Sequence, residues 1–170
     1  MEVNVSSKKA SRQGADRDIK LEEIMQPAVT VAPDASEREV LKVLLENRLP
    51  GVPVVDEEEL LVGFVNDGHL LSSALPEYLK VMADVSFVTE AGDRWVDYFA
   101  ASAERPVSEV MSTEVACVEL GTSEVVAAHK MVYEGVSSVV VADNGKVVGI
   151  VTRLDLYAAI IGGNRALGDP

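Results

Sequence analysis

The chain has 170 residues, 48% of them hydrophobic, which suffices for one compact domain or for two small repeats that share a core. Aromatic residues make up only 5%, so Val, Leu, Ile and Ala must fill the interior. The formal net charge of -13 argues against generic binding to nucleic acid or to anionic lipid, because both are negatively charged.

The cysteine content and the absence of long apolar stretches narrow the class further. Cys117 is the single cysteine, so an internal disulfide is excluded, and its apolar neighbours predict a buried, inert thiol. No apolar stretch approaches the length of a membrane span, and residues 1–20 are polar, without the apolar region of a signal peptide. We therefore expect a soluble, cytoplasmic protein whose residues 1–20 are disordered or loosely packed.

The first ordered unit is expected at residues 21–71. Residues 29–31 predict a short strand, and Ser36 with Glu39 forms a capping box that should start a helix. The apolar face of that helix is predicted to comprise Val40, Leu41, Leu44 and Leu45.

A β-hairpin should follow this helix. Residues 52–55 and 60–65 have strand character and flank an acidic turn at residues 56–59. A second helix is expected after Asn66, so the unit reads strand, helix, strand, strand, helix.

Residues 72–105 interrupt this pattern and predict a helical insertion. Residues 76–82 read as helix, and Gly92 marks a break. The next helical face gathers Trp95, Tyr98, Phe99 and Ser102. Because aromatic residues are scarce, this cluster is either part of the core or a docking surface for a second copy of the chain.

The first pattern returns at residues 106–163. Residues 107–111 echo residues 21–25, and residues 116–118 predict the first strand. The helix that follows should end at Gly135 and should present on one face Val125, Ala128, Met131 and Val132.

The second unit should close with a hairpin and a helix. Residues 139–141 and 146–151 predict two strands joined at Asn144-Gly145, which is a strong hairpin-turn signal. Residues 154–161 predict the last helix, and residues 164–170 a C-terminal tail.

The two units align at a nearly constant offset. Met25 and Met111 are 86 residues apart, and so are Gly63 and Gly149. Asp56 and Asp143 are 87 residues apart. This offset requires one extra residue ahead of the helix in the second unit and one fewer in its hairpin turn. Because a unit of this size buries little by itself, the two should pack together around a pseudo-two-fold axis.

The stretch 147–156 joins a strand to a helix and carries a candidate nucleotide site. Thr152 can cap the helix, whose free N–H groups suit a phosphate, and Asp155 can accept hydrogen bonds from two sugar hydroxyls. Thr152, Arg153 and Asp155 can therefore hold a ribose and a phosphate. Thr152 and Asp155 fit equally well a capping box that binds nothing, and both interpretations stay open on these residues.

Taken in order, these motifs resemble a tandem pair of cystathionine-β-synthase (CBS) domains, often called a Bateman module. The resemblance covers roughly residues 20–163, and its matching elements are residues 24–25, 52–56, 62–65, 110–111 and 148–156. It implies an α+β fold of two βαββα CBS repeats related by pseudo-two-fold symmetry, with the helical insertion between them.

The resemblance also implies a function. Members of the family usually sense adenosine derivatives such as AMP, ADP, ATP or S-adenosylmethionine in a cleft between the repeats, and pairs commonly form a flat dimer. This chain would then be a regulatory module, a homodimer that signals to an effector protein. The residues implied to contact the ligand are Thr152 and Asp155 for phosphate and ribose, with Arg153 beside them, Val115, Ala116 and Cys117 for adenine, and Ser137.

The first repeat departs from the family pattern. At an offset of 86, Asn66 aligns with Thr152 and His69 with Asp155. Asn66 can still cap a helix and His69 can contact a phosphate, but the carboxylate that would accept the ribose is lost. We therefore expect at most one well-formed nucleotide site, in the second repeat.

No catalytic or metal site is predicted. His69 and His129 are too isolated for a metal cluster, and the sequence has neither a strained nucleophile turn nor a P-loop. An adenine nucleotide would be a regulatory ligand and not a required cofactor. Two hypotheses remain: a ligand-sensing regulatory module, and a constitutive dimerisation scaffold with a vestigial cleft.

Overall fold

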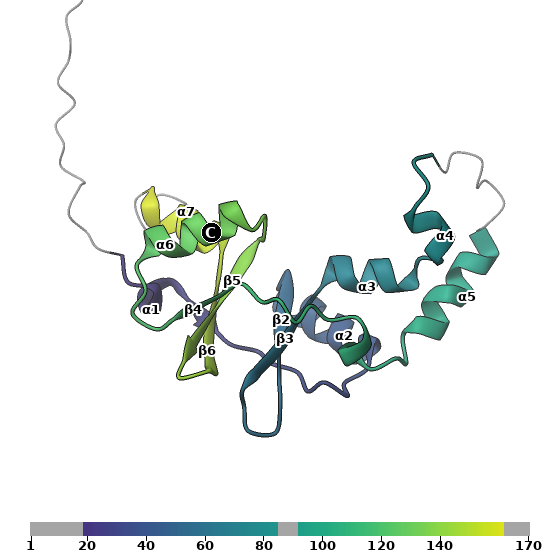
Figure 1. Cartoon of the computed structure of the whole chain (residues 1–170), viewed down its shortest axis with the longest axis horizontal. Helices are drawn as coiled ribbons and strands as arrows, with labels where there is room; N and C mark the ends of the chain where they lie inside the picture. The colour runs from purple at the N-terminus through teal and green to yellow at the C-terminus, as the bar shows by residue number, and fades with distance from the viewer. Residues whose placement is uncertain (1–18, 85–91, 162–170) are drawn as a thin grey trace, which may run out of the picture.

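The computed structural model describes residues 19–84 and 92–161, which form two α/β halves side by side and a helical arm at one end (Figure 1). The first half contains α1 (Leu21–Ile24), β1 (Gln26–Pro27), α2 (Glu37–Asn47), β2 (Gly51–Val55), β3 (Leu61–Asn66) and α3 (Asp67–Ala74). The arm contains α4 (Glu77–Lys80) and α5 (Gly92–Ser102). The second half contains η1 (Val107–Glu109), β4 (Cys117–Glu119), α6 (Glu124–Tyr133), β5 (Ser138–Asp143), β6 (Lys146–Thr152) and α7 (Arg153–Ile160). Of the predicted terminal segments, residues 1–18 and 164–170 lie outside the described part.

The start of each half pairs with a strand of the other half. Gln26 on β1 pairs with Ile150 on β6, and Ser112 pairs with Phe64 on β3. Ser112 and Ile150 stand 86 residues after Gln26 and Phe64, so the two pairs are the same contact made once by each half. The pseudo-two-fold symmetry predicted from the sequence is therefore confirmed.

The cores are exchanged in the same way. Leu21, at the start of the first half, is fully buried in the core of the second half beside Met131 and Val151. Its counterpart Val107 is fully buried in the core of the first half beside Val40. Neither half completes its own core, so we infer that the two halves fold as one unit.

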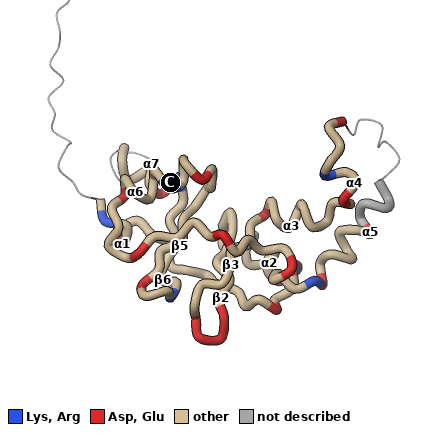
Figure 2. Tube along the Cα trace, viewed as in Figure 1, with Lys and Arg blue, Asp and Glu red and all other residues tan. Residues whose placement is uncertain are grey.

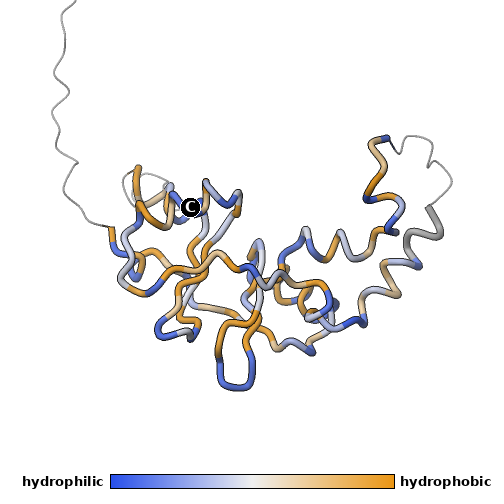
Figure 3. Tube along the Cα trace, in the orientation of Figure 1, coloured by the Kyte–Doolittle hydropathy of each residue, from blue (hydrophilic) through white to orange (hydrophobic). Residues whose placement is uncertain are grey.

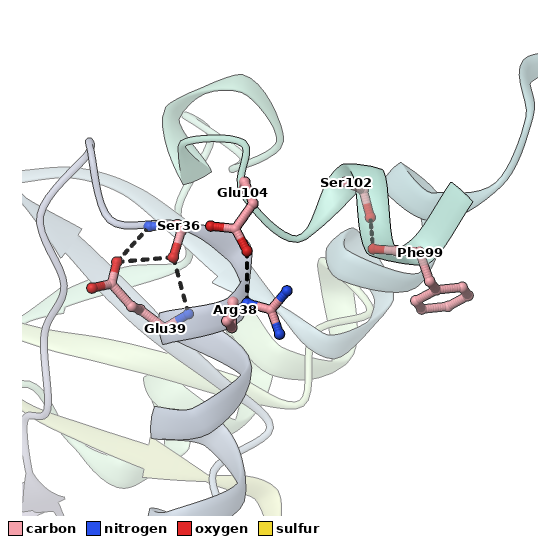
Figure 4. A network of polar contacts seen from close by, with 6 residues as sticks. All are labelled: Ser36, Arg38, Glu39, Phe99, Ser102 and Glu104. Carbon is pink, nitrogen blue, oxygen red and sulfur yellow. Dashed lines mark hydrogen bonds and ion pairs between the residues drawn. The ribbon is translucent and has the colours of Figure 1, made fainter. Parts of the chain in front are cut away.

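The caps and hairpins follow the sequence signals. Ser36 N–H donates to the Glu39 carboxylate at 2.8 Å and Glu39 N–H donates to Ser36 Oγ at 3.3 Å, which confirms the predicted capping box (Figure 4). These hydrogen bonds hold the pKa of the Glu39 carboxyl below its usual value, with the backbone N–H of Ser36 as the main cause. Asn144 and Gly145 have φ values of 51° and 83°, as a two-residue hairpin turn of this type requires.

The predicted strand at residues 29–31 is wrong. Val31 makes a single parallel bridge to Val54, in which Val31 N–H donates to Pro53 O at 3.1 Å. The chain leaves β1, which belongs to the sheet of the second half, and at Val31 it already lies beside β2 in the sheet of the first half. A segment that crosses between two sheets has no room for a longer ladder.

Two predicted helix faces are partly wrong. In α2, Val40 and Leu44 are buried, whereas Leu41 and Leu45 are exposed. In α6 the buried residues are Ala127 and Met131, and two of the predicted residues, Val125 and Val132, are exposed. Ala128, also predicted on the face of α6, is partly buried against the core of the second half. Each helix therefore buries a narrower face than predicted.

The arm meets the first half at the N-terminus of α2. Glu37 N–H and Arg38 N–H, two of the free donors of the first turn, donate to Arg105 O at 3.0 Å and Ala103 O at 2.9 Å. Arg38 also forms a surface ion pair with Glu104 at 2.7 Å (Figure 4). The segment after α5 therefore caps α2.

The aromatic cluster predicted on the insertion is not part of a core within the described residues. Tyr98 and Phe99 are exposed on α5, and Ser102 is buried with its hydroxyl donating to Phe99 O at 3.0 Å. The side chain of Trp95 lies outside the described part.

Charge and hydropathy are distributed unevenly. Acidic residues gather at the turn between β2 and β3, which is also strongly hydrophilic (Figures 2 and 3). Hydrophobic residues follow the strands and occur along the helices (Figure 3), and several of those on the helices are exposed. None of the helices in residues 19–84 and 92–161 combines the length and apolar character needed to cross a membrane.

Candidate functional site

A cavity of about 310 Å³ lies between the two halves. The first half contributes Phe64, Asn66 and His69 from the junction of β3 and α3. The second half contributes the loop before β4, the loop before β5 with the first residue of β5, and the first residue of α7. These residues are Ser112, Glu114, Val115, Ala116, Gly135, Val136, Ser137, Ser138 and Arg153. Any occupant of this cavity would touch both halves.

The first wall is built on a helix cap. Asn66 Oδ1 accepts a hydrogen bond from His69 N–H at 2.8 Å, so the predicted capping role of Asn66 is confirmed. The cap fixes His69 at the third residue of α3, and its ring lines the cavity. His69 Nδ1 is buried without a hydrogen-bond partner among the described residues. Buried polar atoms are normally paired, so this nitrogen is a candidate to meet a ligand.

The second wall combines apolar surface with one cation. Arg153 N–H donates to Ser137 O at 3.0 Å and Arg153 Nε donates to Val136 O at 2.8 Å. These two bonds fix the start of α7 against the loop before β5, and they leave the terminal guanidinium nitrogens to other partners. Apolar surface comes from Val115 and Val136. This mixture suits a flat apolar ring joined to an anionic group.

The cavity gathers only part of the predicted ligand set. Val115, Ala116, Ser137 and Arg153 line it. Thr152, Asp155 and Cys117 are not among the described residues that line it. The residues not predicted from the sequence are Phe64 of the first half, the loop residues Ser112 and Glu114, and Ser138 at the start of β5. The equal offsets of the two methionines and the two glycines could have predicted the wall from the first half. They correspond to contacts in which the methionine of one unit meets the glycine of the other.

Thr152 and Asp155 form a capping box at the start of α7. Asp155 Oδ2 accepts hydrogen bonds from Thr152 N–H at 2.8 Å and from Thr152 Oγ1 at 2.7 Å. Asp155 N–H donates in return to Thr152 Oγ1 at 3.2 Å. A second partner, Gln26 Nε2, donates to Asp155 Oδ1 at 3.1 Å. The helix-cap interpretation of this motif is therefore realised in the structure.

Cys117 is half-buried at the start of β4. Burial raises the pKa of the Cys117 thiol, and the nearby carboxylate of Glu119 raises it further. A raised pKa leaves less of the nucleophilic thiolate near neutral pH, so reactivity is disfavoured at this position. Within the described residues, no three His, Cys, Asp or Glu side chains are grouped as metal ligands would be.

Comparison with known proteins points to one family. The family model for the CBS domain matches residues 21–75 and 107–162. The chain is 24% identical over 152 residues to the uncharacterized protein MJ1426 of Methanocaldococcus jannaschii, an alignment that covers 83% of this chain and 90% of the relative. It is 31% identical over 139 residues to the CBS domain-containing protein CBSX1, chloroplastic, of Arabidopsis thaliana, where the alignment covers 77% of this chain and 58% of the relative.

Solved structures share the fold. A crystal structure of CBSX2 in complex with AMP matches with a TM-score of 0.62 and 23% identity, over 84% of this chain and 96% of that one. The CBS domain pair of protein MJ0100, in complex with 5′-methylthioadenosine and S-adenosyl-L-methionine, matches with a TM-score of 0.65 and 22% identity, over 86% and 98%. At these identities the likeness establishes the architecture and not the ligand.

Proposed function

The chain belongs to the CBS-domain family, and on this basis we propose that it is a regulatory module that binds an adenosine-type ligand in the cavity between its repeats. The observation that carries the proposal is that both repeats line one cavity. A ligand held by both repeats can favour one of their relative arrangements, by as much as its affinities for the two arrangements differ. Two structurally similar proteins hold adenosine derivatives, which supports this ligand class.

The cavity offers a role to each part of such a ligand. Adenine would pack against Val115, Ala116 and Val136, and the Ser137 hydroxyl would contact its polar edge. Arg153 would pair with a phosphate or carboxylate, and the buried Nδ1 of His69 would meet a ribose hydroxyl or a phosphate oxygen. Cys117 follows Ala116 in the chain and does not line the cavity.

A thermal-shift panel of AMP, ADP, ATP, NAD and S-adenosylmethionine tests the proposal. We expect at least one member to raise the melting temperature, since a ligand at 100 times its dissociation constant stabilises the fold by about 2.7 kcal/mol. Arg153→Ala should weaken binding about tenfold or more, because it removes a charge-assisted hydrogen bond. Arg38→Ala serves as the control, because Arg38 is an exposed arginine on α2 that does not line the cavity.

Two outcomes would go against the regulatory reading. A panel without any shift would favour the alternative of a constitutive scaffold with a vestigial cleft. A shift that Arg153→Ala and Arg38→Ala reduce equally would place the ligand elsewhere on the chain.

We also propose that the chain forms a homodimer, and that the second copy is the partner that responds to ligand binding. Eight large apolar side chains on or next to α6 and α7 are each 48–81% exposed; they are Val125, Val126, Val132, Tyr133, Leu154, Tyr157, Ile160 and Ile161. Exposed apolar patches beyond a few hundred Å² usually mark interaction sites, and a standard interface buries about 800 Å² on each partner. The concentration of exposed apolar side chains on these two helices supports a self-complementary dimer contact.

The mass in solution tests the dimer. We expect light scattering to give twice the chain mass of 18.2 kDa, and Leu154→Asp to give the monomer, because it buries a charge in the contact. Leu120→Asp is the matched control, since Leu120 is an exposed leucine in the loop after β4. A wild-type monomer at micromolar concentration, or a dimer that survives Leu154→Asp, would contradict the assignment.

A further inference from the structure

The cavity between the halves contains a histidine in surroundings that attract an anion. His69 lies in the first turn of α3, a helix of eight residues whose N-terminus favours negative charge. Arg153 lines the wall that comes from the second half. Glu114 is the acidic residue among the described lining residues, and it is exposed. An anion that enters the cavity therefore meets two sources of positive charge beside the imidazole ring.

The imidazole ring itself has an unused hydrogen-bonding position. His69 Nδ1 is buried and has no partner among the described residues. A protonated imidazole carries two N–H donors, and a buried donor without an acceptor is unfavourable. A phosphate in the cavity would supply an acceptor and an opposite charge together. A half-turn of the ring about its Cβ–Cγ bond keeps the outline of the ring, so either nitrogen can be turned toward the phosphate.

The other charged groups on the elements packed around His69 are exposed or already paired. On α3 itself, Asp67 is exposed, and its carboxylate accepts a backbone N–H at 2.9 Å. On α5, Asp97 is exposed. Glu37 of α2 forms its ion pair with Arg105 and accepts a hydrogen bond from the last turn of α3. The charged groups that share the cavity with His69 are therefore the arginine and the glutamate of its lining.

We propose that an anionic ligand enters the cavity together with a proton, which His69 takes from the solvent and holds against a phosphate of the ligand. The inference rests on the proposed function and deepens it, because it selects adenosine derivatives that carry a phosphate over the uncharged nucleoside. Histidine is the side chain whose ordinary pKa, about 6.5, lies closest to neutral pH, and an adjacent negative charge favours its protonated form. Arg153 stays charged throughout this range, so it adds affinity without pH dependence.

The direction of the pH dependence follows from linkage. If binding takes up a proton, the affinity for the ligand rises as the pH falls, by at most about tenfold per pH unit for one proton. The rise ends at the pH below which the free protein already holds that proton. The phosphate of AMP titrates near pH 6 itself, and a variant without the imidazole separates the two effects.

Calorimetric titration of the full chain with AMP and with adenosine, between about pH 6.5 and 8.5, tests the proposal. From the lower to the higher pH, we expect the wild-type affinity for AMP to fall about fivefold more than that of His69→Gln. The affinity for adenosine should not change. Titration near pH 7.5 in buffers of different ionisation enthalpy counts the protons, and the wild type should take up more than the variant does.

A control and a second readout keep the test independent of the behaviour of one variant. His129→Gln removes the other histidine, which is exposed on α6 and stacks on Tyr133, and it should retain the wild-type proton uptake. Positive surroundings make the phosphate of AMP release protons, so uptake by the wild type has to come from the protein. The proton count on the wild type therefore remains decisive if His69→Gln does not fold.

The outcomes separate this inference from the proposed function. Binding of AMP without proton uptake, or with an uptake that His69→Gln retains, overturns the role of His69 and leaves the cavity proposal standing. Binding of adenosine as tightly as AMP at every pH does the same, and so does binding of another member of the thermal-shift panel without binding of AMP. If no member of the panel binds, both proposals are overturned.

Discussion

Replacement of Arg105 with alanine is expected to destabilise the fold by about 3 kcal/mol, because it leaves the carboxylate of Glu37 buried without its counter-charge. Glu37 is only 4% exposed, and Arg105 Nε lies 3.3 Å from its Oε1. Ser73 Oγ donates to the other oxygen at 2.5 Å, and Arg105 Nη2 donates to Ser73 O at 2.8 Å. The expected loss of stability is at the lower end of the range for breaking a buried ion pair, because the Arg105 side chain is 39% exposed.

Arg38→Ala provides a matched control on the same helix. Arg38 and Glu104 form a shorter ion pair, 2.7 Å, but both side chains are largely exposed, so its loss should change stability by about 0.5 kcal/mol or less. Urea unfolding measures both variants, with an unchanged slope as the sign that the unfolded state is comparable. Adding Glu37→Gln to Arg105→Ala should restore part of the loss, since it removes the unpaired charge. If Arg105→Ala destabilises the fold no more than Arg38→Ala does, the cluster of Glu37, Ser73 and Arg105 does not anchor the arm.

This cluster was not foreseen from the sequence, and its distance along the chain explains why. Glu37 starts α2, Ser73 lies in the last turn of α3 and Arg105 follows the arm, so no local pattern links them. In the sequence Glu37 looks like an ordinary acidic residue in a first helical turn, where it would be solvated. Its burial depends on the arm folding back over α2.

Features that depend on a few neighbouring residues were predictable. The capping box at Ser36 and Glu39 and the hairpin turn at Asn144-Gly145 each depend on backbone geometry within four residues. The repeat itself was also predictable, because the offsets of the methionines and glycines are visible in the sequence. Helix faces were less predictable, since Leu41 and Leu45 fit the apolar pattern of α2 and are nevertheless exposed.

The lining of the cavity could be predicted only in part, because its walls come from different repeats. The predicted ligand set combined Asp155 with Val115 and Ser137, which all belong to the second repeat. The pairing of Ser112 with Phe64 instead brings β3 of the first half against the loops of the second half, so His69 faces Val115 across the cavity. Asp155 lies beside Gln26 and does not line the cavity. Contacts that cross between repeats cannot be read from one repeat alone.

The glycines of the two hairpins show how tightly the repeats interlock. A Cβ at Gly149 would lie 2.6 Å from Met25 Sδ and 3.1 Å from the backbone oxygen of Gln26. A Cβ at Gly63 would meet the side chain of Met111 in the same way, with side-chain atoms alone as its nearest neighbours. Both glycines therefore allow the start of the opposite repeat to approach a β-strand closely.

Gly149→Ala is therefore expected to destabilise the fold by about 1–3 kcal/mol, as overpacking of a filled core does. Met25→Ala in the same chain should relieve only part of this cost, because the backbone of Gln26 still stands against the new methyl group. Gly63→Ala should be rescued more fully by Met111→Ala, where a flexible side chain is the whole obstacle. Urea unfolding of the two single and two double variants gives the comparison.

The difference between the two rescues is the informative result. Equal rescue at both sites would mean that the strand carrying Gln26 can shift freely, which conflicts with its pairing to Ile150. Poor rescue at Gly149 would instead mean that Gln26 is held by its backbone at a fixed distance from β6 and α7. The side chain of Gln26 would then keep its hydrogen bonds to Asp155 in Gly149→Ala, because the backbone that positions it does not move.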